Sequence, residues 1–297
     1  MKRFSTILAF VAAFILTASS VCAQTVKRDF DLKGFTSLEI SNDFKATVQR
    51  SNDFSVSVEL SEELVPYLDV RVSKGVLIVA LRNVPTKLTL LKKNVIEASI
   101  SMPDLRGVSL NDGVKLTVAG RFDLGNNDFA LSTAGASEVK QMEIHAKNAT
   151  LSLAGASRIH LSGDFATVDI TSTGTSRLDL GADADELFVK SSGTAVSEIE
   201  GSFDTIDLDL GGTSNVTLKG KADDLKVKAS TAGSADALRM PAATADVSLS
   251  GAGVCKVYVK EALEVQCTGA STCSYKADGE IRMNPKEIAR TATLKKL

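Results

Sequence analysis

The stretch "LSLAGASRIHL" (Leu151–Leu161) alternates apolar and polar residues on both sides of a knot of small residues around a glycine. The same arrangement returns in "LDLGGTSNVTL" (Leu208–Leu218) and in "VSLSGAGVCKV" (Val247–Val257). Alternation with a period of two is typical of β-strands that bury one face and expose the other. The sequence therefore predicts strands joined by tight turns, in a unit that is repeated along the chain.

The knots recur with a period near 19 residues. A unit this short, with no helical stretch, cannot bury its apolar side alone, so successive units must stack on one another. This predicts a parallel β-solenoid in which small residues occupy tight corners. Gly113 marks the first knot, and the turn-forming glycines of the others are Gly135, Gly155, Gly174, Gly193, Gly212, Gly233, Gly251 and Gly269.

Residues at a constant distance from the knot glycine form columns of like character. Four positions before it, every residue from the second knot onward is apolar: Leu131, Leu151, Ile170, Val189, Leu208, Ala229, Val247 and Val265. Four positions after it stand Val139, Ile159, Leu178, Ser197, Val216, Ala237, Cys255 and Cys273. Ser197 is the exception, and Ile199 two residues later indicates a local bulge. The columns predict continuous ladders of like side chains inside a rod.

Three regions follow from the regularity of the pattern. We expect irregular, wider turns that cap the solenoid in residues 24–110 and regular turns in residues 111–280. We expect a second cap or a trailing tail in residues 281–297. Within the first region, "SNDFKATV" (Ser41–Val48) echoes "LNDGVKLTV" (Leu110–Val118), and "SEELVPYL" predicts a short helical turn or a loop. An antiparallel β-sandwich also has short alternating strands. The solenoid is favoured because the columns match across units and not across hairpins.

The first 23 residues have the composition of a secretory signal peptide. Lys2 and Arg3 precede the apolar run "ILAFVAAFIL", and cleavage is expected after Ala23. Cys22 invites a lipoprotein interpretation, but Val21 and Ser19 are not the residues that lipid-modifying peptidases prefer. No later stretch is long and apolar enough to span a bilayer. We therefore expect an exported protein in the periplasm, on the cell surface or outside the cell, without a lipid anchor.

Composition excludes several classes of partner. The formal net charge is −2 and no basic block stands out, which argues against nucleic acid and anionic lipid surfaces as partners. The chain has no Trp, three Tyr and two His, so aromatic platforms for stacking bases or sugars are scarce.

Cys255 and Cys273 are 18 residues apart in one column, so they are expected on adjacent turns. A disulfide between them is possible in an exported protein. The alternative is that both are buried apolar thiols, since in-register parallel pairs hold their Cβ atoms slightly too far apart and Cys267 leaves an odd count. No histidine spacing supports a metal site.

Histidines and carboxylates do not form a catalytic pattern in the sequence. His145 and His160 are predicted to be surface residues, because no nucleophile is implied beside them. The acidic groups that a polysaccharide-cleaving solenoid enzyme would need are Asp183, Asp185, Glu186, Glu198, Glu200 and Asp204. Their positions near turns favour solvated charges that keep the rod soluble. We therefore predict no catalytic, cofactor-binding or metal-binding residues.

The segments "RDFDLKGFTSLEIS", "VSKGVLIVAL" and "IEASISMPDLRGVSLND", followed by repeated "GAS" and "SGAG" units, resemble the putative auto-transporter adhesin, head GIN domain family. The resemblance extends over roughly residues 26–279. It implies a right-handed parallel β-helix in the envelope or exterior of Bacteroidetes-like bacteria, and it supplies no catalytic residues.

The leading hypothesis is an exported, non-enzymatic adhesin or envelope binding module that presents a rigid face to a glycan or protein ligand. The threonines and serines of the knots would form a flat polar strip for binding, or they serve only to turn the corners. The alternatives are a carbohydrate-active β-helix enzyme, a lyase or hydrolase, and a purely structural envelope component. The oligomeric state is left open.

Overall fold

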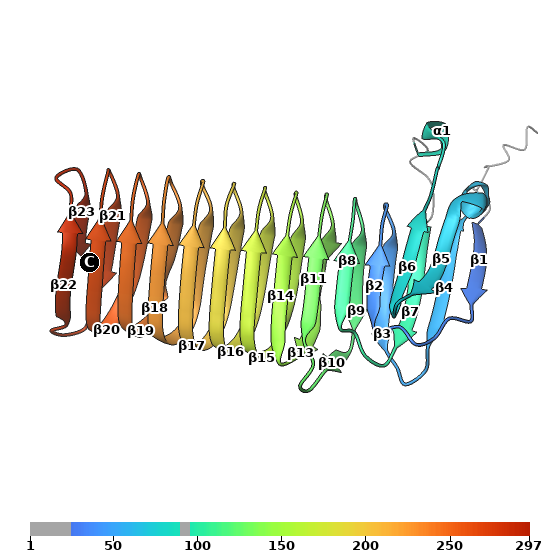
Figure 1. The fold of residues 1–297 in the computed structure, drawn as a ribbon, viewed down its shortest axis with the longest axis horizontal. Helices are drawn as coiled ribbons and strands as arrows, with labels where there is room; N and C mark the ends of the chain where they lie inside the picture. Colours follow the sequence, from blue (N-terminus) through green and yellow to red (C-terminus); the bar gives the residue numbers. More distant parts are fainter. Residues whose placement is uncertain (1–24, 90–95) are drawn as a thin grey trace, which may run out of the picture.

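The computed structural model describes residues 25–89 and 96–297. The predicted signal peptide lies outside the described residues. The chain is nearly all β and forms a β-solenoid of about 10 turns, which confirms the predicted architecture (Figure 1). At about 4.8 Å per turn, the stack is roughly 50 Å long. None of the helices in the described residues is long and apolar enough to cross a membrane.

The elements fall into an irregular first part and a regular second part. The first part comprises β1 (Thr25–Phe30), β2 (Ser37–Ile40), β3 (Lys45–Arg50), β4 (Ser55–Ser61), the 3-10 helix η1 (Glu62–Tyr67), β5 (Leu68–Ser73), β6 (Val76–Leu81), α1 (Thr86–Thr89), β7 (Ile96–Met102), β8 (Gly107–Leu110), β9 (Lys115–Ala119) and β10 (Arg121–Asp123). The short strands that follow are β11 (Phe129–Thr133), β12 (Glu138–Val139), β13 (Glu143–His145) and β14 (Asn148–Leu153). The long, bent strands are β15 (Arg158–Ser172), β16 (Arg177–Ser191), β17 (Val196–Leu210), β18 (Asn215–Ala229), β19 (Ser234–Leu249) and β20 (Val254–Cys267), and the last turn has β21 (Thr272–Lys276), β22 (Arg282–Ile288) and β23 (Thr293–Lys296).

The first part of the chain does not stack in sequence order. β4 runs antiparallel to both β1 and β7, and β5 forms an antiparallel hairpin with β6. β2 lies between β6 and β8, and β3 lies between β7 and β9, all in parallel register. The two echoing segments are therefore direct neighbours, with Lys45 opposite Lys115 and Val48 opposite Val118. The segment predicted as a helical turn or a loop, residues 61–68, contains η1, which confirms the helical turn.

From β8 onward each turn pairs in parallel with the next. The ladder of Leu151, Ile170, Val189 and Leu208 is continuous, and all four side chains are buried. The residues that follow them in the sequence face outward and are polar: Ser152, Thr171, Lys190 and Asp209. The alternation predicted from the sequence therefore separates core residues from solvent-facing ones.

Two expectations about the columns are wrong. Thr231 (φ 59), and not Gly233, has the left-handed conformation at its corner, so the residues around this knot shift by two positions. Leu208 consequently pairs with Val227 instead of Ala229, and Val216 pairs with Ala235 instead of Ala237. The bulge expected at Ser197 is also absent, because Leu178 pairs with Ser197 and Leu180 with Ile199 in unbroken register.

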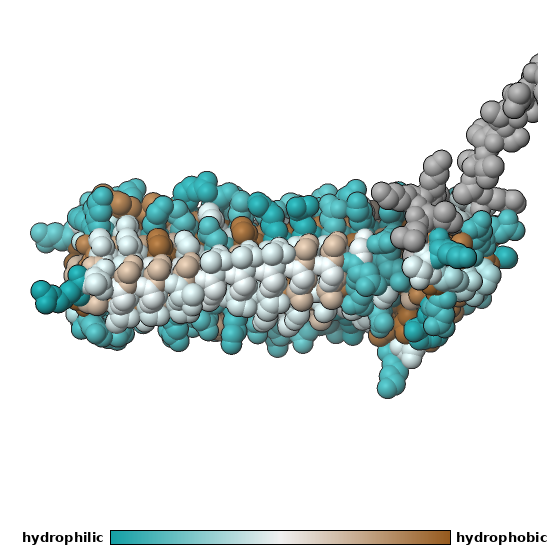
Figure 2. Space-filling view, turned by 90° about the horizontal axis from the view of Figure 1, so that it is seen from above, coloured by the Kyte–Doolittle hydropathy of each residue, from teal (hydrophilic) through white to brown (hydrophobic). Residues whose placement is uncertain are grey.

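The tight corners are stacked backbone to backbone. Ala156 N–H donates to the Gly135 carbonyl at 2.7 Å, and Thr175 N–H donates to the Gly155 carbonyl at 2.8 Å. A Cβ atom on Gly155 would lie 2.4 Å from the Gly135 oxygen, which explains why the corner excludes larger residues there. The small residues form the pale stripe that runs along the rod in Figure 2.

Ser197 leads to a stability prediction, because its hydroxyl is buried and has no hydrogen-bond partner among the described residues. Ser197→Ala is expected to raise the free energy of unfolding by about 1 kcal/mol, since it removes a desolvated polar group without changing the backbone. Ser157→Ala is the control, because the Ser157 hydroxyl donates to the Ala154 carbonyl at 2.8 Å. Its loss should lower the stability by about 1 kcal/mol. Chemical denaturation followed by circular dichroism measures both, and equal effects of the same sign would contradict the prediction.

Candidate functional site

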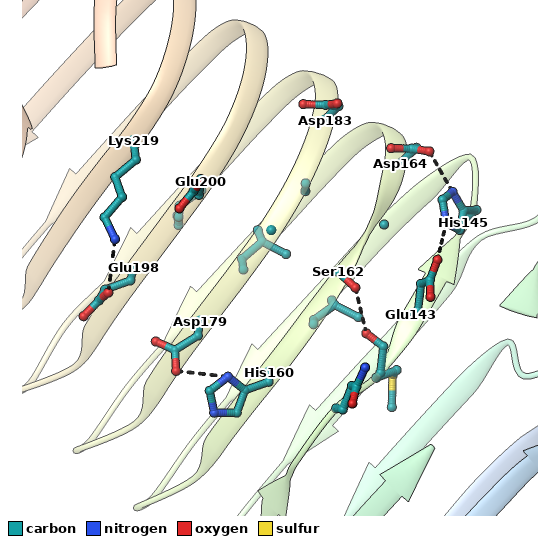
Figure 3. A pocket seen from close by; sticks show the side chains of 18 residues that line it. Glu143, His145, His160, Ser162, Asp164, Asp179, Asp183, Glu198, Glu200 and Lys219 are labelled. Atoms are coloured by element: carbon teal, nitrogen blue, oxygen red, sulfur yellow. Dashed lines mark hydrogen bonds and ion pairs between the residues drawn. The ribbon is translucent and has the colours of Figure 1, made fainter. Parts of the chain in front are cut away.

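A groove of about 640 Å³ lies on the outer face of the rod, where β13, β15, β16, β17 and β18 run side by side (Figure 3). Its floor is formed where Gly181 stands between Ser162 and Glu200 on the neighbouring turns, so that one column of outward side chains is interrupted. A Cβ atom on Gly181 would meet only the Ser162 Cβ, at 3.9 Å. The missing side chain at Gly181 therefore leaves this part of the groove open, and the backbone does not require a glycine there.

Polar side chains from adjacent turns line this hollow and pair with one another (Figure 3). His145 Nδ1 lies 2.8 Å from an oxygen of Asp164, and His160 Nδ1 lies 3.2 Å from an oxygen of Asp179. Asp183 accepts a hydrogen bond from the Ser202 backbone N–H at 2.8 Å. Each pair joins residues one repeat of 19 apart, because that spacing places them on neighbouring turns.

Glu198 is the centre of an ion-pair network at one side of the groove. Its carboxylate oxygens lie 2.9 Å from Arg177 Nη2 and 3.7 Å from Lys219 Nζ. Arg177 also contacts Asp179, with 3.5 Å between Nε and Oδ1. The Glu198 side chain is 43% exposed, so the ion-pair network is in contact with solvent. The ion pairs fix the position of the Glu198 and Asp179 carboxylates, and both carboxylates stay accessible to a ligand.

The structure brings together several residues that the sequence analysis considered separately. His145, His160, Asp183, Glu198 and Glu200 all line the groove. Asp185 and Asp204 line a second hollow of about 540 Å³ next to it, together with Asp164, Asp183 and Asp223. Glu186 lines neither hollow. Asp164, Gly181 and Lys219 were not among the residues predicted from the sequence, although the 19-residue period places Asp164 beside His145.

Neither hollow has the arrangement of a metal centre. Within residues 25–89 and 96–297, no group of three or more His, Cys, Asp or Glu side chains is placed to hold a metal ion. Ser162 Oγ donates to the Met142 carbonyl at 3.5 Å, and no interaction between this hydroxyl and a histidine is found among the described residues.

The three described cysteines lie in the core, away from the groove. Cys255 and Cys273 are in register on adjacent turns, and these two and Cys267 are buried free thiols. Burial raises the pKa of the Cys273 thiol to about 12, and it raises the pKa of Cys255 and Cys267 as well. All three are therefore protonated at neutral pH.

The fold and groove define a rod-shaped β-solenoid with an acidic, polar site on its side. Residues 34–195 and 180–279 match the model of the family described as putative auto-transporter adhesin, head GIN domain, and the chain belongs to this family.

Two solved structures have the same fold. One is a putative adhesin from Parabacteroides merdae ATCC 43184, at 13% identity and a TM-score of 0.53, covering 93% of this chain and 97% of that one. The other is described as a putative lipid binding protein from Parabacteroides distasonis ATCC 8503, at 14% identity and a TM-score of 0.53, covering 93% and 98%. No curated protein matches the chain. The two structures show the fold, and the family membership supports an adhesin or binding role.

Proposed function

We propose that this protein is an exported, non-enzymatic adhesin whose ligand binds in the groove over β15–β18. The observation that carries the proposal is the convergence of polar side chains from successive turns on a hollow that a single glycine, Gly181, leaves open. Membership of an adhesin family and the signal-peptide composition of residues 1–23 support it. The rod provides a rigid support, so the groove binds a ligand without first having to be ordered.

The ion pairs favour binding over catalysis. Glu198 is held between two cations, and Asp179 is held between His160 and Arg177. A carboxylate fixed in this way is a well-oriented acceptor for ligand hydroxyl groups. An acid–base pair for glycoside cleavage needs two carboxyl groups that face the scissile bond, whereas those of Glu198 and Asp179 are engaged by side chains of the protein.

The charge of the groove selects the class of ligand. Carboxylates outnumber the cations here, because two histidines, Lys219 and the adjacent Arg177 stand against six acidic residues. The acidic residues are Glu143, Asp164, Asp179, Asp183, Glu198 and Glu200. This negative field repels acidic polysaccharides. Neutral, hydroxyl-rich glycans can donate hydrogen bonds to the same oxygens. We therefore infer a neutral glycan of the cell surface or the surrounding matrix as the ligand.

A glycan array containing neutral and uronate-rich oligosaccharides tests this proposal. We expect hits among the neutral glycans, and we expect Gly181→Leu to weaken them by roughly tenfold or more, because the leucine fills the groove. Gly211→Leu is the matched control. Gly211 also has open space around its Cβ position, with the nearest atom at 3.8 Å, but it belongs to the stripe of small residues at the tight corner.

Three outcomes would contradict the proposal. The array could give no neutral hits, Gly211→Leu could abolish binding while Gly181→Leu does not, or the protein could shorten a bound glycan. The second outcome would move the site to the corner stripe, and the third would make the protein an enzyme. Chromatography of each hit after overnight incubation detects cleavage.

A further inference from the structure

Among the described residues, no strand covers the turn formed by β22 and β23. Met283 continues the buried ladder of Leu263, Ile288 continues that of Cys267, and Leu294 continues that of Cys273. No strand in residues 25–89 or 96–297 pairs with the outer edges of β22 and β23. Met283 and Ile288 are each 37% exposed, and Leu297 is 56% exposed. Three of the four large hydrophobic side chains exposed in the described chain therefore lie in this turn.

The same turn is rich in basic side chains. Residues 281–297 contain one carboxylate side chain, Glu287, and five cations: Arg282, Lys286, Arg290, Lys295 and Lys296. Lys286 forms an ion pair with Glu264 of the preceding turn. The other four cations form no ion pair with any described residue. In Figure 2, this end of the rod shows hydrophobic and hydrophilic atoms side by side. We refer to this surface, formed by residues 281–297, as the terminal face.

We propose that the terminal face docks end-on to an anionic phospholipid surface. An apolar centre of about three side chains enters the boundary between headgroups and acyl chains, and the unpaired cations around it contact lipid phosphates. Charge complementarity favours this partner over a second copy of the chain, because two terminal faces placed together would bring like charges into contact. The sequence alone argued against anionic lipid, since the five cations are spaced along the tail and form no block.

Docking at the terminal face would fix the orientation of the groove relative to the membrane. Docking through the terminal face would stand the rod upright on the membrane. The groove on the side of β15–β18 would then be held away from the lipid surface and open to ligands. The inference does not depend on the identity of the ligand in the groove.

Vesicle co-sedimentation tests the proposal with purified protein that lacks residues 1–23. We expect binding to vesicles of phosphatidylglycerol mixed with phosphatidylcholine, little binding to phosphatidylcholine alone, and weaker binding as salt rises. Lys295→Glu combined with Lys296→Glu should weaken binding by roughly tenfold or more. The matched control is Lys190→Glu combined with Lys228→Glu, which makes the same change in net charge at exposed lysines on the side of the rod and should have little effect.

A third variant separates a lipid surface from other anionic or apolar partners. Ile288→Ser should weaken binding to the vesicles but leave binding to soluble dextran sulfate unchanged. Equal losses from both lysine pairs, or no preference for phosphatidylglycerol, would overturn the proposal. So would a stable dimer in analytical ultracentrifugation that Ile288→Ser dissociates, because the terminal face would then be an interface between two copies.

Discussion

Gly193→Ala is expected to lower the free energy of unfolding by about 3 kcal/mol or more. Gly193 has φ 76, and a Cβ atom there would lie 2.6 Å from the Gly174 carbonyl oxygen of the turn below. The left-handed conformation costs an alanine about 1 kcal/mol, and separating two stacked backbones adds a larger amount. The Thr194 N–H bond to the Gly174 carbonyl, 2.8 Å long, would lengthen as well.

Gly75 provides a control for backbone conformation. It has φ 77, almost the same as Gly193, but no atom lies within 4 Å of its Cβ position. Gly75→Ala should therefore lose only the conformational term of about 1 kcal/mol. Urea unfolding followed by circular dichroism compares the two variants. If both lose the same stability, the corner stack does not limit residue size, and the explanation for the repeated knots is wrong.

Leu208→Ala should lower the free energy of unfolding by about 3 kcal/mol. Leu208 is fully buried, and its side chain stacks between those of Val189 and Val227. The turns above and below are fixed by continuous backbone hydrogen bonds, so they cannot collapse into the space that the leucine leaves. The loss therefore includes a cavity term as well as the lost burial of apolar surface.

Asp209, the next residue in β17, tests whether the loss of stability on truncation to alanine depends on the face of the strand. Asp209 is exposed and forms no ion pair with any described residue. Asp209→Ala should change the free energy of unfolding by less than about 0.5 kcal/mol. Thermal and urea unfolding of both variants measure the contrast. A loss at Asp209 comparable to that at Leu208 would contradict the assignment of alternate residues to core and solvent.

The regular part of the fold could be predicted because each turn poses the same packing problem. The period, the alternation and the apolar columns all express the requirement that one face of every strand meets the turn below. The prediction failed at Gly233 for a physical reason. Thr231 adopts the left-handed conformation itself, so the glycine two residues later marks a knot without forming its corner. The residue types of the knot "TAGSA" do not show whether Thr231 or Gly233 takes the left-handed corner position.

The groove was less accessible to sequence reasoning. His145 and Asp164 are unremarkable alone, and only the 19-residue period makes them neighbours. The period that sorts core residues into columns also relates the polar residues between them, but polar columns are mixed in character and give a weaker signal. Gly181 also lies outside the knots, where an unstrained glycine produces no signal in a single sequence.

The repeat period alone therefore specified a solenoid with small-residue corners and a sorted core, because these follow from neighbour contacts at a constant spacing. The placement of β2 and β3 between later strands, the hollow at Gly181 and the exposure of the terminal face are decided only by the folded chain. The histidine–carboxylate pairs beside the hollow follow the 19-residue period. The period does not indicate which outward position lacks a side chain or which strands pair out of sequence order.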